Sequence, residues 1–250
     1  MRYLLAFLVC CLTAAPLLGQ DDLNLAQFYL TPAYLNPAFV GTTPHYRAVF
    51  HHRSQWNAIG ATPNRQLASF EYNFITFDGG LGVQVLRTSF GGDLPWQSTA
   101  ARLAYGQRIY LNRRWIIGGG LEVTYVNGGL DTDQLTFEDA LLSGDPTQEI
   151  NLPQERNSYL DLNAGLTIYN KAFYAGVALR NLTKPKRNAF GTTLNQLERA
   201  LLLQAGYKTE ILPEQYLAPA LLFRYQNSFY QMDIGTNFDN QYFFGGLWYR

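Results

Sequence analysis

The three histidines could hold a metal ion or act as general bases, since neutral imidazole is a common ligand and proton acceptor. They are His45, His51 and His52, all close to the first segment with a strand pattern. His51 and His52 are adjacent, and adjacent side chains of a strand point to opposite faces, so the pair is poorly placed to share one metal ion. Ser54 follows on the same segment, but nothing around it resembles the turn that carries a hydrolase nucleophile. We therefore expect no metal and no cofactor, and we keep a hydrolase as an alternative hypothesis.

Two further motifs have residue types that could bind ions. Asp131 and Asp133, followed by Glu138 and Asp139, could form a calcium loop, but they lack the glycine and the closing glutamate of an EF-hand. The pattern favours a solvated acidic loop. The glycines 118–120 follow two apolar residues but open no helix, so they do not form a phosphate-binding loop. They predict close strand packing instead.

Arginines recur on the polar faces of the segments that alternate between apolar and polar residues. They could form a ladder that selects anions, or they could pair with acidic residues on the same faces, and the sequence favours pairing. The arginines are Arg47, Arg53, Arg102, Arg108, Arg180 and Arg224, and the acidic residues are Glu71, Glu122, Asp161 and Asp233.

The elements that would position these side chains are strands, because a period of two residues dominates the chain beyond residue 45. Between residues 160 and 168, for example, Leu160, Leu162, Leu166 and Ile168 share one face, while Asp161 and its polar neighbours share the other. The predicted strands are 45–56, 64–75, 80–90, 96–110, 114–127, 157–169, 172–182, 199–211, 216–227, 229–238 and 241–250.

Alternation alone does not separate a soluble sandwich from an outer-membrane barrel, but three features favour the barrel. The segments are long enough to cross a membrane at a tilt. Aromatic residues, at 15% of the chain, gather at segment ends, as Trp96 and Trp115 do, and Trp56, Trp248, Tyr110, Tyr169, Tyr216 and Tyr242 follow the same pattern. Tight turns at Asn112-Arg113, Asn170-Lys171 and Asp239-Asn240 alternate with long connections over 128–156 and 183–198. We predict an all-β, antiparallel transmembrane barrel over residues 45–250, multi-pass in a bacterial outer membrane, with lipid around it.

The N-terminus predicts export. Residues 1–19 have a basic start, an apolar middle and a small-residue end, which is typical of a signal peptide. Cys10 and Cys11 both lie in it, so the exported chain would have no disulfide and no thiolate site. It would carry one more acidic than basic residue, which gives nucleic-acid binding no support.

Between the signal peptide and the first strand, residues 20–44 fit neither helix nor strand. They include the stretch QFYLTPAYLNPAFVG, whose two prolines and Asn36-Pro37 step predict a sharply bent, plug-like segment. The strand count of eleven is odd, whereas bacterial single-chain barrels use even numbers. We therefore expect C-terminal strands to be missing from this sequence.

These N-terminal residues resemble the signature of the PorP/SprF family, outer-membrane proteins of the type IX secretion system of Bacteroidetes. The resemblance rests on Gln27-Phe28-Tyr29, on Asn36 to Gly41, on Arg47 and on Arg53-Ser54-Gln55-Trp56, with further matches at Asn181-Leu182, Pro185 and 246–250. Thr31-Pro32 stands where the family pattern has a first Asn-Pro, and His52-Arg53 where it has Tyr-Arg.

The resemblance implies a barrel that is not an enzyme. It implies partners too: a secreted protein, such as a gliding adhesin, held through its C-terminal sorting domain, and periplasmic ring or motor components. A passive or substrate-specific channel for small solutes is the alternative. The expected site residues, which either shape the plug or contact the partner, are Tyr34, Asn36, Pro37, Arg47, Arg53, Gln55 and Trp56.

Overall fold

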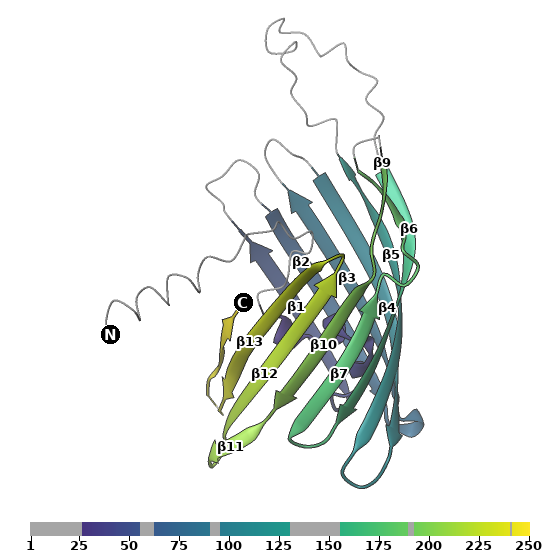
Figure 1. The fold of residues 1–250 in the computed structure, drawn as a ribbon. Coiled ribbons are helices and arrows are strands. Elements are labelled where there is room, and N and C mark those ends of the chain that lie inside the picture. Colours follow the sequence, from purple (N-terminus) through teal and green to yellow (C-terminus); the bar gives the residue numbers. More distant parts are fainter. Residues whose placement is uncertain (1–26, 56–62, 91–95, 131–155, 190–192, 241) are drawn as a thin grey trace, which may run out of the picture.

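One curved antiparallel sheet accounts for most of the protein (Figure 1). The computed structural model describes residues 27–55, 63–90, 96–130, 156–189, 193–240 and 242–250. The predicted signal peptide, Trp56 and the acidic residues 131–139 lie outside these ranges. No helix among the described residues is long and apolar enough to cross a membrane.

Eleven strands follow one another in the sheet in the order β1-β2-β3-β4-β5-β6-β7-β10-β12-β13-β14, and β11 pairs with β12. The strands are β1 (Tyr46–Ser54), β2 (Pro63–Phe74), β3 (Gly79–Phe90), β4 (Trp96–Tyr110), β5 (Ile116–Leu130), β6 (Arg156–Tyr169), β7 (Phe173–Arg180), β10 (Ala200–Tyr207), β11 (Thr209–Leu212), β12 (Gln215–Gln226), β13 (Phe229–Asp239) and β14 (Phe244–Tyr249). Within the described residues β1 pairs only with β2, and β14 only with β13. The sheet is therefore an open cylinder with these two strands at its edges.

The two faces of the sheet have opposite chemistry. On β3 the inner side chains Gln84 and Leu86 are buried, whereas the outward Val83 and Val85 are 45% and 44% exposed. The same pattern recurs at Leu162, which is 46% exposed beside two buried polar residues. A soluble sandwich would bury its apolar face, so an apolar outer face is typical of a sheet surrounded by lipid. The predicted all-β, antiparallel fold is confirmed, and it is consistent with an outer-membrane β-barrel.

The tight turns predicted from the sequence all lie at one end of the sheet (Figure 1). In each, an asparagine side chain accepts from the backbone two and three residues ahead. Asn112 Oδ1 accepts from Arg114 N and Trp115 N at 2.8 and 2.9 Å. Asn170 and Asn240 make the equivalent pairs of bonds. A short amide that satisfies the turn backbone locally explains why two-residue polar steps suffice here.

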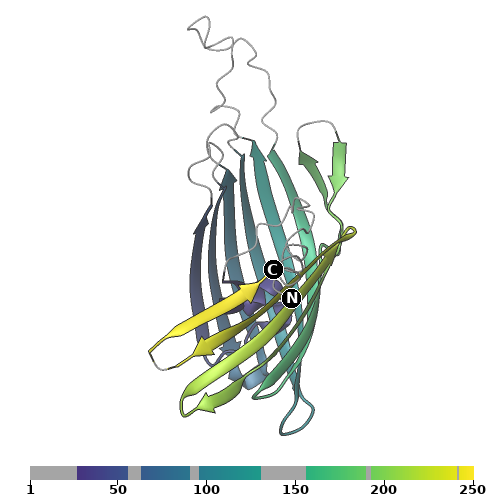
Figure 2. The ribbon, with the colours of Figure 1, turned by 60° about the vertical axis from the view of Figure 1, so that its left-hand side comes forward.

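The structure corrects three details predicted from the sequence and adds a contact at a fourth position. The predicted strand over 199–211 is two strands, β10 and β11, broken at Lys208. The predicted loop over 183–198 contains the hairpin β8 (Lys186–Ala189) and β9 (Thr193–Gln196), which stands apart from the main sheet (Figure 2). Residues 20–44 are not wholly irregular, because the described part contains three short helices. Trp248 lies at the margin of β14, as predicted, and its ring stacks on Tyr29 of the N-terminal segment, with ring centroids 5.7 Å apart.

Candidate functional site

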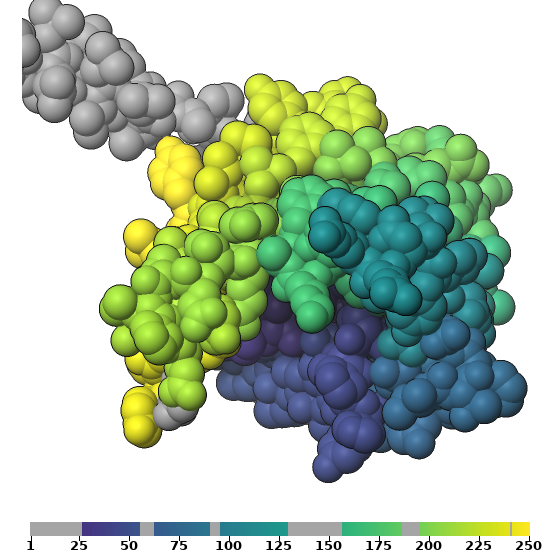
Figure 3. Space-filling view, turned by 90° about the horizontal axis from the view of Figure 1, so that it is seen from below, coloured from purple at the N-terminus to yellow at the C-terminus, as the bar shows by residue number. Residues whose placement is uncertain are grey.

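The N-terminal residues 27–44, called the plug segment below, lie against the inner face of the sheet. Seen from the tight-turn end, the segment is recessed between the strands on either side (Figure 3). Its helices are η1 (Phe28–Leu30), α2 (Pro32–Leu35) and η2 (Pro37–Phe39), and every residue of the last two except Pro32 is buried. Both begin with proline, whose fixed φ and missing N–H suit the first helical position.

Asn36 fixes the bend between α2 and η2. Its backbone is extended, at φ −145° and ψ 115°, as expected for a residue before proline. Its Oδ1 accepts from Ala38 N at 2.9 Å and so caps η2. Its Nδ2 donates to Leu166 O on β6 at 3.2 Å and to Val177 O on β7 at 3.3 Å. This fully buried amide therefore joins the predicted Asn36-Pro37 bend to two strands of the sheet.

A row of inward glycines forms the seat on which the plug segment rests. Gly80, Gly106, Gly120 and Gly165 are directly paired across β3, β4, β5 and β6. A Cβ on Gly106 would lie 2.5 Å from the carbonyl oxygen of Val40, and a Cβ on Gly120 or Gly165 would overlap Pro37 or Asn36. The predicted close packing at 118–120 is found against the plug backbone at Gly118 and Gly120, and also between strands at Gly118, where a Cβ would lie 2.8 Å from Thr167 Cγ2 on β6. Nothing in the sequence alone pairs these glycines across strands.

Arg108 holds the end of the plug segment. Its Nη1 donates to Gly41 O at 2.6 Å, its Nη2 to Asn73 Oδ1 at 2.6 Å and its Nε to Asp78 O at 3.2 Å. Gly41 has φ +76°, a left-handed conformation that suits glycine, and it packs against Gly80. Arg108 was predicted either to select anions or, more favourably, to pair with an acidic side chain, but it bonds instead to two backbone carbonyls and to Asn73 and so seats the plug.

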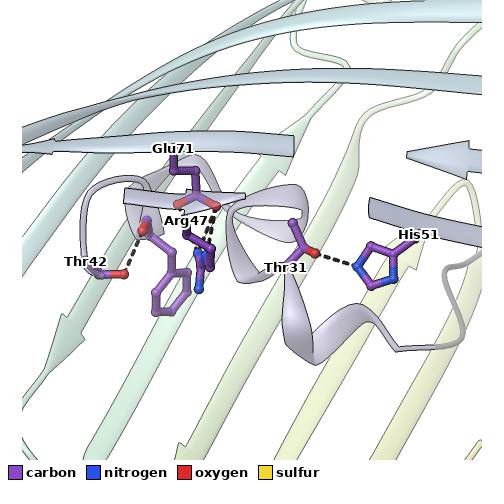
Figure 4. A network of polar contacts seen from close by, with 6 residues as sticks. Thr31, Thr42, Arg47, His51 and Glu71 are labelled. Carbon is purple, nitrogen blue, oxygen red and sulfur yellow. Dashed lines mark hydrogen bonds and ion pairs between the residues drawn. The ribbon is translucent and has the colours of Figure 1, made fainter. Parts of the chain in front are cut away.

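Two polar contacts lie on β1 beside the plug segment, one with the segment itself and one with β2 (Figure 4). Thr31 Oγ1 lies 2.7 Å from His51 Nε2, so the inward member of the histidine pair contacts the plug. Arg47 Nη2 donates to both carboxylate oxygens of Glu71 at 2.9 Å, and the Glu71 side chain is 2% exposed. The predicted pairing of arginine with acid is confirmed at Arg47.

The other predicted site residues take different positions. The ring of Tyr34 faces the guanidinium groups of Arg102 and Arg180, at 4.7 and 5.6 Å from its centroid. Arg53 lies on the inner face of β1, directly opposite Arg65. Gln55 follows the end of β1, where its backbone N–H donates to Pro63 O at 3.2 Å. The structure therefore brings Tyr34, Asn36 and Pro37 together in the plug segment, with Arg53 and Gln55 toward the long-connection end.

Remaining acidic residues of the inner face have defined partners. Glu122 accepts from Asn163 Nδ2 at 2.7 Å and from Thr124 Oγ1 at 3.1 Å. Asp161 accepts from Thr183 Oγ1 at 2.7 Å, and Asp233 pairs with Arg250 at 2.8 Å. Among the residues that the structure describes, no three His, Cys, Asp or Glu side chains gather closely enough to hold a metal ion.

This geometry defines a class of protein, in which an antiparallel sheet with an apolar outer face encloses its own N-terminal segment. The family described as type IX secretion system membrane protein PorP/SprF matches residues 17–250, and the chain belongs to this family. The resemblance seen in the sequence is thereby confirmed over nearly the whole chain. No curated protein matches the chain.

Proposed function

We propose that this protein is an outer-membrane barrel of the type IX secretion system that binds and anchors a secreted surface protein, such as a gliding adhesin. The partner would be recognised through its C-terminal sorting domain, and the protein would not act as an enzyme. The observation that carries the proposal is the family match over residues 17–250.

The outer face supports a location in the outer membrane. Large apolar side chains from successive strands point outward and are about half exposed, as at Val83, Leu103, Val123 and Leu162. Burying such side chains in lipid is favourable by about 25 cal/mol per Å² of apolar surface. Polar side chains of the same strands point inward, which is the alternation of a membrane-spanning sheet.

The two ends of the sheet suggest different partners. The longest stretches of chain between neighbouring strands follow β5 and β7, whose ends lie opposite the tight turns, so we assign the secreted protein to that end. The compact tight-turn end is then the one available to periplasmic ring or motor components. Arg53 lies near the end of β1, Gln55 follows that end and Trp56 is next in the sequence, which makes these three the expected partner contacts. Tyr34, Asn36 and Pro37 instead shape the plug segment, together with Arg47 at β1.

The plug segment favours anchoring over the alternative of a solute channel. Its buried residues fill the inner face across β3 to β7, and Asn36 and Arg108 bond it to the wall. A passive channel would need this segment to be absent or displaced.

Affinity purification of the tagged protein from its own membranes tests the proposal. We expect a secreted protein with a C-terminal sorting domain to copurify, and liposomes that contain the purified protein to retain small solutes. The proposal fails if the protein purifies alone while its liposomes leak.

A variant pair tests the residue assignment. Arg53→Ala should reduce capture of the secreted protein without lowering the amount of folded protein. Arg87→Ala is the matched control, because Arg87 is exposed and points outward from β3. Equal capture by both variants would rule out a contact at Arg53, and a loss of folded Arg53→Ala protein would make Arg53 a structural residue.

A further inference from the structure

Three polar side chains form a buried row on the inner wall beside the plug segment. Ser69 on β2 is directly opposite Gln84 on β3, and Gln84 is directly opposite Arg102 on β4. They are 5%, 1% and 6% exposed. Directly opposed residues on antiparallel strands have Cβ atoms about 5 Å apart, so the three side chains line one small patch.

Five polar atoms of this row have no hydrogen-bond partner among the described residues. They are Ser69 Oγ, both polar atoms of the Gln84 amide, and Nε and Nη1 of Arg102. The neighbouring polar cluster differs, because Asn163 and Thr124 hydrogen-bond with Glu122. Buried polar groups are nearly always hydrogen-bonded, so this set of unsatisfied polar atoms, most of them donors, needs an occupant.

The charge around the row indicates what the occupant must be. Arg65 and Arg180 lie close enough to Arg102 to repel it, whereas Glu122 is the one carboxylate of the described residues that attracts it noticeably. Glu122 makes its side-chain hydrogen bonds with Asn163 and Thr124, and the Tyr34 ring covers the Arg102 guanidinium from one side. A buried guanidinium without a hydrogen-bonded anion is strongly unfavourable, so an anion is the occupant that resolves both problems.

We propose that Ser69, Gln84 and Arg102 form a binding site for a carboxylate. A carboxylate can accept from Nε of Arg102 in a charge-assisted hydrogen bond, and Nε2 of Gln84 and the Ser69 hydroxyl supply further donors. The carboxylate could come from a small anion or from a polypeptide, since both present the same group. This site does not depend on the proposed anchoring function, because its evidence is the unsatisfied row alone.

Thermal unfolding of the full chain in detergent tests the site, with acetate exchanged for chloride at constant ionic strength so that screening stays the same. We expect a saturable rise in the unfolding temperature of the native sequence. Arg102→Gln should weaken the apparent affinity for acetate by about tenfold or more, because a charge-assisted hydrogen bond is lost. Arg87→Gln removes the same charge from the outer face and should respond as the native sequence does.

A second variant keeps the test decisive if Arg102→Gln does not fold. Gln84→Glu places a carboxylate directly opposite Arg102, so it should raise the unfolding temperature without acetate and abolish the response to acetate. The proposal is overturned if Arg102→Gln responds to acetate as the native protein does, if Gln84→Glu responds as the native protein does, or if the native protein responds neither to acetate nor to the peptides described next.

Short peptides distinguish the two sources of the carboxylate. Stabilisation by a peptide with a free C-terminus, but not by its C-terminally amidated form, would identify a polypeptide carboxylate as the ligand. Stabilisation by acetate without any response to either peptide would identify a small anion. Both results support the site, and the absence of a response to acetate and to both peptides contradicts it.

Discussion

Replacing Asn36 by alanine should release the plug segment from the sheet. The substitution removes the cap on Ala38 N and the two hydrogen bonds to Leu166 O and Val177 O. Loss of a helix cap costs about 1 kcal/mol, and each further buried hydrogen bond contributes about 1 kcal/mol net. The expected loss in plug docking is therefore about 3 kcal/mol, which corresponds to a roughly 100-fold larger undocked population.

Cleavage by chymotrypsin measures that population, because the plug segment contains Tyr34 and Phe39 and both are buried when it is docked. When docking is fast relative to cleavage, the cleavage rate follows the undocked fraction. We expect cleavage after these residues to accelerate by roughly 100-fold in Asn36→Ala. Asn127→Ala is the control, since Asn127 is exposed on the same sheet.

A conservative variant separates the two parts of the Asn36 contribution. Asn36→Asp keeps an oxygen that can accept from Ala38 N but replaces the donors to the two strand carbonyls with a carboxylate oxygen. It should therefore undock the plug segment at least as much as Asn36→Ala does. The reasoning is refuted if Asn36→Ala is cleaved at the native rate, or if Asn36→Asp restores native resistance.

Three further predictions concern the glycine seat, the hydrogen bonds of Arg108 to the plug segment and its surroundings, and the outer face. Gly120→Val should undock the plug segment because its side chain would occupy the space of Pro37, whereas Gly119→Val should not, since a Cβ there meets only Leu166 Cδ2 at 3.8 Å; chymotrypsin cleavage compares the two. Arg108→Ala should lower the free energy of unfolding by about 2–3 kcal/mol, because charge-assisted hydrogen bonds are lost. Arg114→Ala, at an exposed position, is the control, and equal denaturation midpoints of the two variants would contradict the role of Arg108. Leu162→Arg should cost about 2–4 kcal/mol if it faces the middle of a bilayer, measured as folding into lipid vesicles, and unimpaired folding would argue against lipid contact there.

The sheet was largely predictable from the sequence, because the period of two along segments such as 160–168 is set by the chain itself. The apolar face points outward and the polar face points inward, so the alternation in the sequence corresponds directly to the two faces of the folded sheet. Strand ends were predicted less well. One predicted strand, 199–211, is divided at Lys208 into β10 and β11.

The candidate site was only partly predictable. Asn36-Pro37 signals a bend by itself, but the partners of Asn36 lie 130 and 141 residues away along the chain. Likewise, Gly80, Gly106, Gly120 and Gly165 form a row only after the strand register is known. The sequence contains each glycine but does not show which glycines are aligned across strands. The glycine seat and the bond from Arg108 to Gly41 could therefore not be predicted.

The distribution of these contacts bears on how the plug segment behaves in a secretion protein. Thr31 contacts β1, Asn36 contacts β6 and β7, and Gly41 accepts from Arg108 on β4, so the segment is held from widely separated strands. A movement that opened the interior would have to break these contacts together, at a cost of several kcal/mol. A partner bound at the long connections would have to supply that energy through differential binding to the two states. This cost favours the proposed anchoring function over a channel whose plug segment opens for passive solute flow.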